Sequence, residues 1–384
     1  MGTVITGKTL IRLVVIWLVV IGFTLFGHQI LGAEMSPLSA TIAFVILLAT
    51  ILTASFGVVK EADELAHKLG EPYGTLILTL SIVAIEVVLI AAVMLGPGES
   101  PTIGKDSIFS VMMIIMNLVA GLCILLGGLK YKEQEYNAQG TLSYFSMIVI
   151  LGGTALIIPN FIQGAGNGEF TTTQAIFISG LVILIYGCFL GFQMKGFQHL
   201  YIQPKAGSLD VLYKERESLM QSSANDETKT SGSKQEIWVR SIVLIAMILP
   251  IVLLSHNMAL VVDYGIEAAK LPIQLSGILI AIIVFTPESI TAIKASLNNE
   301  VQRTINLCHG AFVSTVGLTV PAVLIVGLIM DKTVLFGLTS TEMVLFLMTL
   351  LLSLVTFLGK RTSPILGVIH LALFAVFMLL VFVP

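Results

Sequence analysis

Charged residues are scarce in this chain of 384 residues. Asp, Glu, Lys and Arg make up 11% of it, whereas hydrophobic residues make up 56%. Soluble domains carry about a quarter charged residues, so this chain has too few charges to cover a surface that faces water. Its charges lie in short clusters between apolar runs, and several runs reach the roughly 20 residues needed to cross a bilayer. The sequence predicts an all-α polytopic membrane protein whose main partner is the lipid bilayer.

The chain also lacks the motifs of common enzyme classes. It has no HExxH motif, no Walker loop and no dinucleotide-binding fingerprint. Its three cysteines, Cys123, Cys188 and Cys308, lie inside apolar runs without paired spacing, which argues against a disulfide or metal framework. The net charge is −3 and no basic stripe is present, which argues against a nucleic-acid partner. We therefore expect neither enzymatic activity nor a cofactor.

Apolar runs predict about eleven membrane-spanning helices. The first run follows Lys8 and Arg12 and exceeds the 7–15 apolar residues of a signal peptide, so we expect an uncleaved helix. The polar segment 195–236 is expected to be a cytoplasmic linker. The predicted spans are 11–31, 38–58, 74–96, 107–129, 142–160, 173–194, 237–256, 272–297, 305–330, 340–358 and 364–383.

The distribution of positive charges predicts the orientation. If the N-terminus is cytoplasmic, the outer loops hold only Lys105, Lys270 and Lys332, and the other 17 of the 20 Lys and Arg residues lie on the cytoplasmic side. Cytoplasmic loops of membrane proteins carry such an excess. A miscounted helix would distribute these residues over both sides. The observed asymmetry therefore supports both the number of spans and their direction.

An internal repeat divides the chain. One segment runs from Glu64 to Glu86 and a similar one from Glu267 to Glu288, so the paired carboxylates are 22 and 21 residues apart. The two segments lead into the third and the eighth apolar spans. Because these spans are five positions apart, an odd number, the two copies cross the membrane in opposite orientations. The predicted organisation is an extra helix in 1–35 and five-helix inverted repeats in 36–194 and 237–384. Inverted repeats are typical of secondary transporters.

Glu86 and Glu288 are predicted to lie deep in the membrane. A charge at that depth costs a few kcal/mol, so such a residue usually faces a pocket or another polar group. One buried glutamate could be structural, but two at equivalent positions of an inverted repeat should meet near the centre. Paired carboxylates suit a hard cation such as Ca²⁺. Their mutual repulsion favours proton uptake when no cation is bound.

Other polar residues within the spans are candidates for lining this site. Thr79 and Thr286 could add hydroxyl ligands, as could Ser314, which stands beside a threonine in an apolar run, although such hydroxyls more often bond to their own helix. Asn117 stands alone in an apolar run, where its amide needs polar partners. His309 is either a packed polar residue or a proton relay.

Acidic residues also flank the third and eighth spans. Glu64 and its repeat partner Glu267 are predicted on opposite sides of the membrane, where they are either acids of two vestibules or ordinary surface residues. Glu61, Asp63 and Glu71 are expected in a solvated loop at the cytoplasmic end of the third span.

Three segments carry a resemblance to a known family. They are KEADELAHKLGEPYGTLILTLSIVAIEVVLIAAVM at 60–94, NLVAGLCILLGG at 117–128 and FTPESITAIKASLNNEVQRTINLCHGAFVSTVGLTVP at 285–321. They resemble the calcium/proton exchanger (CAX) branch of the cation/calcium exchanger superfamily, and most closely its bacterial ChaA-type members. The resemblance extends over nearly the whole chain, including the arrangement of one helix followed by two sets of five.

The resemblance implies roles for the two glutamates. The family's repeated motif, Gly-Asn-Ala-(Thr/Ala)-Glu, ends in glutamates that bind calcium and exchange protons, and these fall on Glu86 and Glu288. The preceding residues differ here, because 82–85 read Ile-Val-Ala-Ile and 284–287 read Val-Phe-Thr-Pro. The motif's asparagines are therefore absent.

The resemblance also implies a function and a location. It indicates an antiporter of a bacterial cytoplasmic membrane that exchanges cytoplasmic Ca²⁺, and Na⁺ or K⁺ as further candidates, for external protons. The transported ions would be its only ligands. A cation channel, or a monovalent cation/proton antiporter with little calcium activity, is the alternative.

Overall fold

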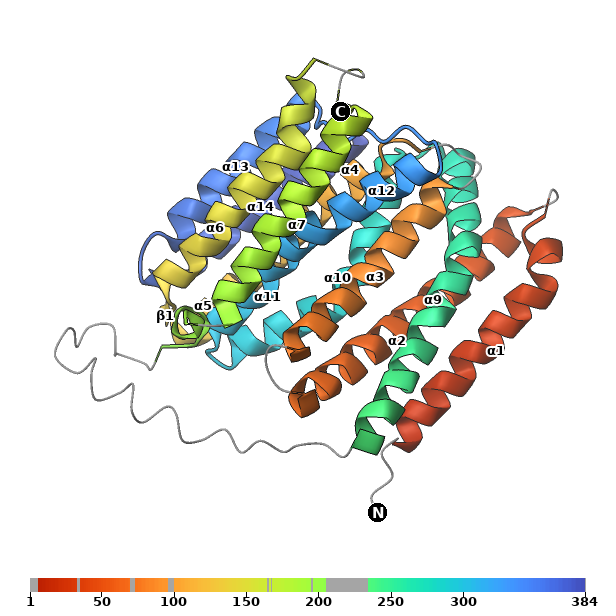
Figure 1. Cartoon of the computed structure of the whole chain (residues 1–384), viewed down its shortest axis with the longest axis horizontal. Coiled ribbons are helices and arrows are strands. Elements are labelled where there is room, and N and C mark those ends of the chain that lie inside the picture. Colours follow the sequence, from red (N-terminus) through yellow and green to blue (C-terminus); the bar gives the residue numbers. More distant parts are fainter. Residues whose placement is uncertain are drawn as a thin grey trace.

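The fold is a bundle of long helices with two short strands among its described residues (Figure 1). The computed structural model describes residues 6–32, 35–69, 73–95, 100–163, 166, 168–194, 196–204 and 234–383. In this part of the chain, ten helical segments are long and apolar enough to cross a membrane, and α3 contains a shorter apolar stretch, Thr79–Met94. The eleven segments confirm the predicted all-α polytopic architecture.

Six of these segments precede the polar segment 195–236. The fourth is a continuous crossing whose middle is the π-helix η1, and the fifth ends in η2 and η3. In chain order the elements are α1 (Gly7–Ile30), α2 (Pro37–Leu69), α3 (Tyr73–Met94), α4 (Ile103–Met112), η1 (Met113–Val119), α5 (Ala120–Tyr131), β1 (Gln134–Glu135), α6 (Ala138–Gly152), η2 (Gly153–Ile157), η3 (Ile158–Asn160), α7 (Thr172–Met194) and the short 3₁₀ turn η4 (Gln198–Tyr201).

Five segments follow. The third of them again contains a π-helix, η5, in its middle. The elements are α9 (Lys234–Ala269), α10 (Gln274–Leu297), α11 (Val301–Ser314), η5 (Thr315–Thr319), α12 (Val320–Ile329), α13 (Ser340–Phe357), β2 (Arg361–Thr362) and α14 (Pro364–Phe382). Strand β2 pairs antiparallel with β1 and so connects the two halves. Most of the predicted linker lies outside the described residues.

Helices α2 and α9 are longer than predicted. The expected spans, 38–58 and 237–256, followed hydropathy, but the helices continue to Leu69 and Ala269. Backbone hydrogen bonding does not stop where the apolar run stops, because charged residues such as Glu and Lys are good helix formers. The two helices pack against each other extensively and form a layer with α1 at one side of the bundle (Figure 1).

Two of the three π-helices among the described residues, η1 and η5, occupy corresponding crossings, and the third is η2. Segment η1 lies in the third crossing of the first proposed repeat, and η5 lies in the third crossing of the second. π-Helical turns are rare and frequently mark functional sites. The two chain ends lie on opposite sides of the bundle, as an odd number of crossings requires (Figure 1). Both observations support the predicted inverted repeat.

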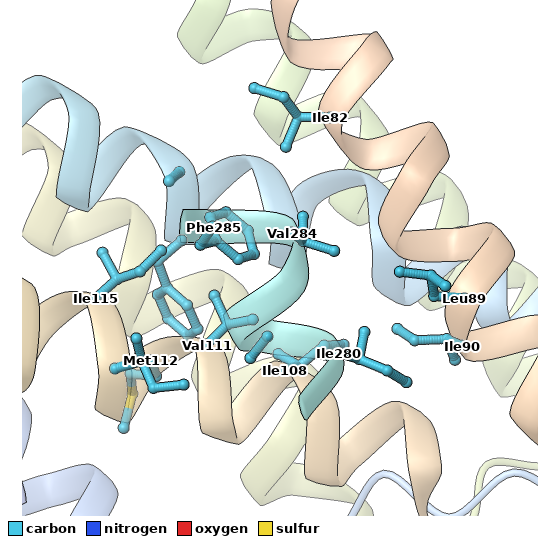
Figure 2. Packing of buried hydrophobic residues seen from close by; sticks show 14 of the residues in the cluster. Ile82, Leu89, Ile90, Ile108, Val111, Met112, Ile115, Ile280, Val284 and Phe285 are labelled. Carbon is cyan, nitrogen blue, oxygen red and sulfur yellow. The ribbon is translucent and has the colours of Figure 1, made fainter. Parts of the chain in front are cut away.

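Helices α3, α4 and α10 share one apolar core at the centre of the molecule. Figure 2 shows Leu89 and Ile90 of α3 directed towards Ile280 of α10, with α4 below α10 in this view. Gly277 allows α10 to approach α4 closely, because a Cβ atom there would lie 2.6 Å from the carbonyl carbon of Asp106. No side chain larger than hydrogen fits at this crossing.

The contact at Gly277 predicts a loss of stability. Gly277→Ala should separate α10 from α4 and destabilise the protein by about 1–3 kcal/mol, the usual cost of overpacking. The measurement is the thermal unfolding midpoint in detergent. Gly180→Ala on α7 is the control, because no atom lies within 4 Å of its added Cβ and alanine favours helices. Equal midpoints for the two variants would contradict the close crossing.

Candidate functional site

Glu86 lies at the centre of α3 and is fully buried. Its Oε2 atom accepts hydrogen bonds from the hydroxyls of Thr315, at 3.1 Å, and Thr319, at 2.8 Å. Both threonines belong to η5, whose π-turn presents two hydroxyls four residues apart to the same carboxylate. The Oε1 atom of Glu86 has no hydrogen-bond partner. One oxygen is thus held in place while the other stays free to bind a ligand.

Glu288 approaches Glu86 from the second half of the chain. It follows Pro287 within α10, which continues through the proline. The two carboxylates are near enough to interact electrostatically. The Oε2 atom of Glu288 is buried without a hydrogen-bond partner. Two free carboxylate oxygens therefore come from the two repeat-related helices.

A cavity of about 230 Å³ reaches Glu288 from one face of the molecule. Its lining includes Arg303 in the first turn of α11, which is 61% exposed, whereas Glu288 lies in the interior. The wall also carries polar groups of Asn306 and Gln193. Glu288 is therefore accessible from the face that holds the α10–α11 turn, while Glu86 is sealed off.

The predicted hydroxyl residues lie near this cavity but have other partners. Thr79 and Ser314 both line it. Thr79 bonds to the hydroxyl of Tyr186, and Ser314 donates to the carbonyl of Ala311. Thr286 donates to the carbonyl of Ile282 one turn earlier. Thr286 thus bonds to its own helix, as membrane-buried threonines commonly do.

Asn117 belongs to a separate polar cluster. Its amide donates to Thr349 of α13 at 2.9 Å, and its Oδ1 lies 3.2 Å from Nδ1 of His370 on α14. The Nε2 atom of His370 lies 3.0 Å from the hydroxyl of Thr356. The amide of Asn117 thus finds its polar partners on α13 and α14. These contacts give Asn117 a role in helix packing.

His309 is packed inside the second half. It is 1% exposed, and its Nδ1 atom lies 3.2 Å from the carbonyl of Ile305. The rings of Phe145 and Phe357 flank it, with centroids at 5.1 and 5.2 Å. Its Nε2 atom has no hydrogen-bond partner.

The acidic residues on α2 form an ion-pair cluster around Arg240 of α9. Arg240 contacts Glu61 at 3.1 Å and Glu64 at 3.4 Å, as well as Glu236 on its own helix at 3.3 Å. Thr9 of α1 adds a hydrogen bond to Glu61. Glu61 is only 4% exposed, so its predicted place in a solvated loop is wrong. The cluster joins α1, α2 and α9 at one end.

The vestibule roles of Glu64 and Glu267 stay predictions. Glu64 forms an ion pair with Arg240, and this positive charge weakens the attraction that Glu64 would exert on cations in a vestibule. Glu267 is exposed near the end of α9. Asp63 is exposed on α2 rather than in a loop, and Glu71 lies outside the described residues.

Sequence reasoning did not assign the hydroxyls that bind Glu86. It noted the Ser314–Thr315 pair and took Ser314 as the candidate, but Thr315 and the overlooked Thr319 make the contacts. The available signal was a pair of threonines four residues apart in an otherwise apolar span. Nothing in the sequence shows that this segment forms a π-turn, which changes the face that each side chain occupies.

A polytopic bundle with two repeat-related carboxylates at its centre, one of them reached by a polar cavity, has the architecture of a secondary transporter. Residues 39–195 and 240–383 match the family described as sodium/calcium exchanger protein. The chain belongs to this family. It is a multi-pass cation/proton antiporter of the cation/calcium exchanger superfamily, and not an enzyme.

Individual relatives agree with this assignment. The chain is 34% identical over 335 residues, 86% of each protein, to the sodium-potassium/proton antiporter ChaA of Escherichia coli. It is 25% identical over 82% of its length, and 81% of the relative, to a Ca²⁺/H⁺ antiporter of Aphanothece halophytica. The solved structure of native YfkE superposes with a TM-score of 0.72 at 19% identity, over 98% of this chain and all of that one, which shows the fold.

The contacts to Glu86 predict an effect on cation affinity. Thr319→Val removes a donor to the buried carboxylate, and hydrogen bonds to charged groups contribute about 1.5–3 kcal/mol. We expect the half-saturating cation concentration to rise about tenfold or more in a vesicle transport assay. Thr286→Val is the matched control, because that hydroxyl bonds to its own helix. A similar rise of the half-saturating concentration in the control would show that the effect does not depend on the hydrogen bond to Glu86.

Proposed function

We propose that this protein exports Ca²⁺, and also Na⁺ or K⁺, in exchange for protons that bind the same two carboxylates, Glu86 and Glu288. The observation that carries the proposal is the electrostatic interaction between two glutamates of repeat-related helices, each with a free oxygen. Because these oxygens can hold either a cation or protons, the two ions compete for one site.

Electrostatics supports coupling between the ions. Two unit charges about 4 Å apart repel each other by roughly 4 kcal/mol at an effective dielectric constant of 20. An empty site therefore favours at least one protonated carboxyl group. One Ca²⁺ balances both carboxylates, whereas one Na⁺ or K⁺ balances only one. Cation binding from the cavity thus displaces protons, and release of the cation allows protons to return.

The ligands around the pair bear on cation selectivity. Ca²⁺ prefers six to eight oxygen ligands. The described site offers two carboxylates and the hydroxyls of Thr315 and Thr319, so water would have to complete the shell of a bound Ca²⁺. A relative named as a sodium-potassium/proton antiporter and another named as a Ca²⁺/H⁺ antiporter support including both classes of cation.

One-sided access favours an exchanger over a channel. The cavity reaches Glu288, but Glu86 has no exposed surface, so the described residues leave no opening at Glu86 in this conformation. In alternating access, the site opens to one side at a time as one group of helices moves against another.

We also propose that the cavity faces the cytoplasm of a bacterial cell. Its mouth lies beside the α10–α11 turn, on the same face as Lys130 and Arg361. That face carries the excess of positive residues expected on the cytoplasmic side. The protein would then bind cytoplasmic cations in this conformation.

Glutamine substitutions test the central pair. Glu86→Gln and Glu288→Gln should each abolish cation-dependent proton movement in everted vesicles, because glutamine keeps the volume but cannot cycle a proton. Proton movement is followed with a pH-sensitive dye after separate additions of Ca²⁺, Na⁺ and K⁺. Asp331→Asn, an exposed change from carboxylate to amide in the turn after α12, is the control and should retain transport.

The outcome also ranks the cations. Transport retained in either central variant would remove that glutamate from the site. A wild-type response to Na⁺ and K⁺ without a response to Ca²⁺ would restrict the function to monovalent cations. Conductive flux that no proton movement accompanies would instead support a channel.

A further inference from the structure

Two very small cavities lie near Glu288 in addition to the wide cavity, and one of them shares Glu288 and Leu307 with the wide cavity. One is lined by residues that include Glu288, Ala292 and Cys308, and the other by residues that include Cys308, His309 and Gln134. Each measures about 10 Å³. That is close to the least space a water molecule needs, about 10–15 Å³. Because Cys308 lines both, the cavities adjoin across its side chain.

Two residues that line the cavity beside His309 each carry an unsatisfied polar atom. Gln134 and His309 are each 1% exposed, and neither Oε1 of Gln134 nor Nε2 of His309 has a hydrogen-bond partner. The carbonyl of Ile305 can only accept, so Nδ1 of His309 carries the hydrogen and Nε2 is an acceptor. Both acceptors belong to residues around a largely apolar space that is about the size of one water molecule.

The cavity beside Glu288 reaches the carboxylate itself. The Oε2 atom of Glu288 is buried and has no hydrogen-bond partner. A water here could accept the proton of a protonated carboxyl group, and the thiol of Cys308 separates it from the next cavity. Neither cavity has room for a hydrated cation, which carries several waters with it.

Gln134 connects this line of cavities to the surface. Its Nε2 atom donates to the carbonyl of Ser296 at 3.1 Å and to Oδ1 of Asn299 at 3.0 Å. Asn299 lines an open surface pocket of about 590 Å³ that also includes Glu133 and Glu135. The Gln134 side chain therefore stands between surface water and the cavity of His309.

We propose that these cavities form a proton path between Glu288 and the face of the α10–α11 turn, separate from the wide cavity that admits the cation. The proposal rests on the proposed exchange function. The O–H bond of protonated Glu288 breaks and its proton passes to water. His309 Nε2 takes up the proton and returns it to water, and a swing of the Gln134 amide opens the path to the surface pocket.

A separate path solves an electrostatic problem. A cation that enters the wide cavity repels a proton that leaves through the same space, and the repulsion is strong where little water screens it. The wide cavity also carries Arg303 at its mouth, beside which a proton would have to pass. Departure along the second path keeps the two positive charges apart while they exchange at Glu288.

Burial in an apolar interior disfavours the charged form of His309, so an imidazolium there would be short-lived. The nearest aromatic rings are those of Phe145 and Phe357, with centroids at 5.1 and 5.2 Å. The titratable groups near it are weak acids or a second imidazole, so none holds a fixed charge that would trap the proton. They are Tyr144 of α6, Cys123 of α5, His370 of α14 and Cys308 of α11.

Comparison of two transport modes tests the path. Cation–cation exchange needs no net proton movement, so it reports the wide cavity and the carboxylates alone. His309→Phe and Gln134→Leu should lower cation-dependent proton flux in vesicles about tenfold or more. The same variants should leave exchange of radioactive Ca²⁺ or Na⁺ within about twofold of the wild type, since the cation does not use these cavities.

Two further variants sharpen the result. Gln134→Ala removes the side chain that closes the path, so its proton flux should equal or exceed that of the wild type. Thr349→Val is the matched control, because it breaks a buried hydrogen bond of the same half without touching the cavities. It should change both transport modes equally or neither.

Three other outcomes would each contradict a proposal. Equal losses in the two transport modes of His309→Phe and Gln134→Leu would show that these residues only support packing and would overturn the path. Unchanged proton flux in both would overturn it as well. Absence of cation–cation exchange in the wild type is a different result, because it would overturn the proposed exchange function itself.

Discussion

The cost of holding charge in an apolar interior governs the structure around Glu86 and Glu288. A carboxylate at membrane depth needs donors, a counter-ion or a proton. The hydroxyls of Thr315 and Thr319 satisfy one oxygen of Glu86, and they leave the other oxygen and part of Glu288 unsatisfied. The incomplete satisfaction of the pair keeps the site receptive to a mobile positive charge. Complete satisfaction would have produced a stable packing contact instead of a transport site.

The architecture was predictable because the bilayer imposes it on the sequence. Hydropathy indicated the crossings, and the nearly equal spacing of carboxylates in two segments pointed to Glu86 and Glu288. Hydropathy failed at the ends of α2 and α9, where charged helix-forming residues extend the helices beyond the apolar runs. There Glu61 becomes a buried partner of Arg240, a contact between residues 179 positions apart that local sequence does not encode.

The polar groups that surround the two glutamates were not predictable, because the rotation of each helix decides which side chains face the site. A hydroxyl in an apolar span bonds either to its own backbone or to a neighbouring helix, and composition does not distinguish these outcomes. Thr286 bonds to its own helix, and Thr319 bonds to Glu86 on another. The π-turn that aims Thr319 at Glu86 has no simple sequence signal. For the same reason Asn117, a reasonable candidate for the site, bonds to α13 and α14.

The unequal environments of the two glutamates follow from an inverted repeat held in one state. If both halves had identical surroundings, the site would be open to both sides or to neither, and no gradient could be coupled. Here η5 covers Glu86 with two hydroxyls, while Glu288 borders a cavity. The asymmetry is therefore what one-sided access requires. In the proposed exchange, Glu288 is then the carboxylate at which cation and proton exchange places, because it borders both a small cavity and the wide cavity among the described residues.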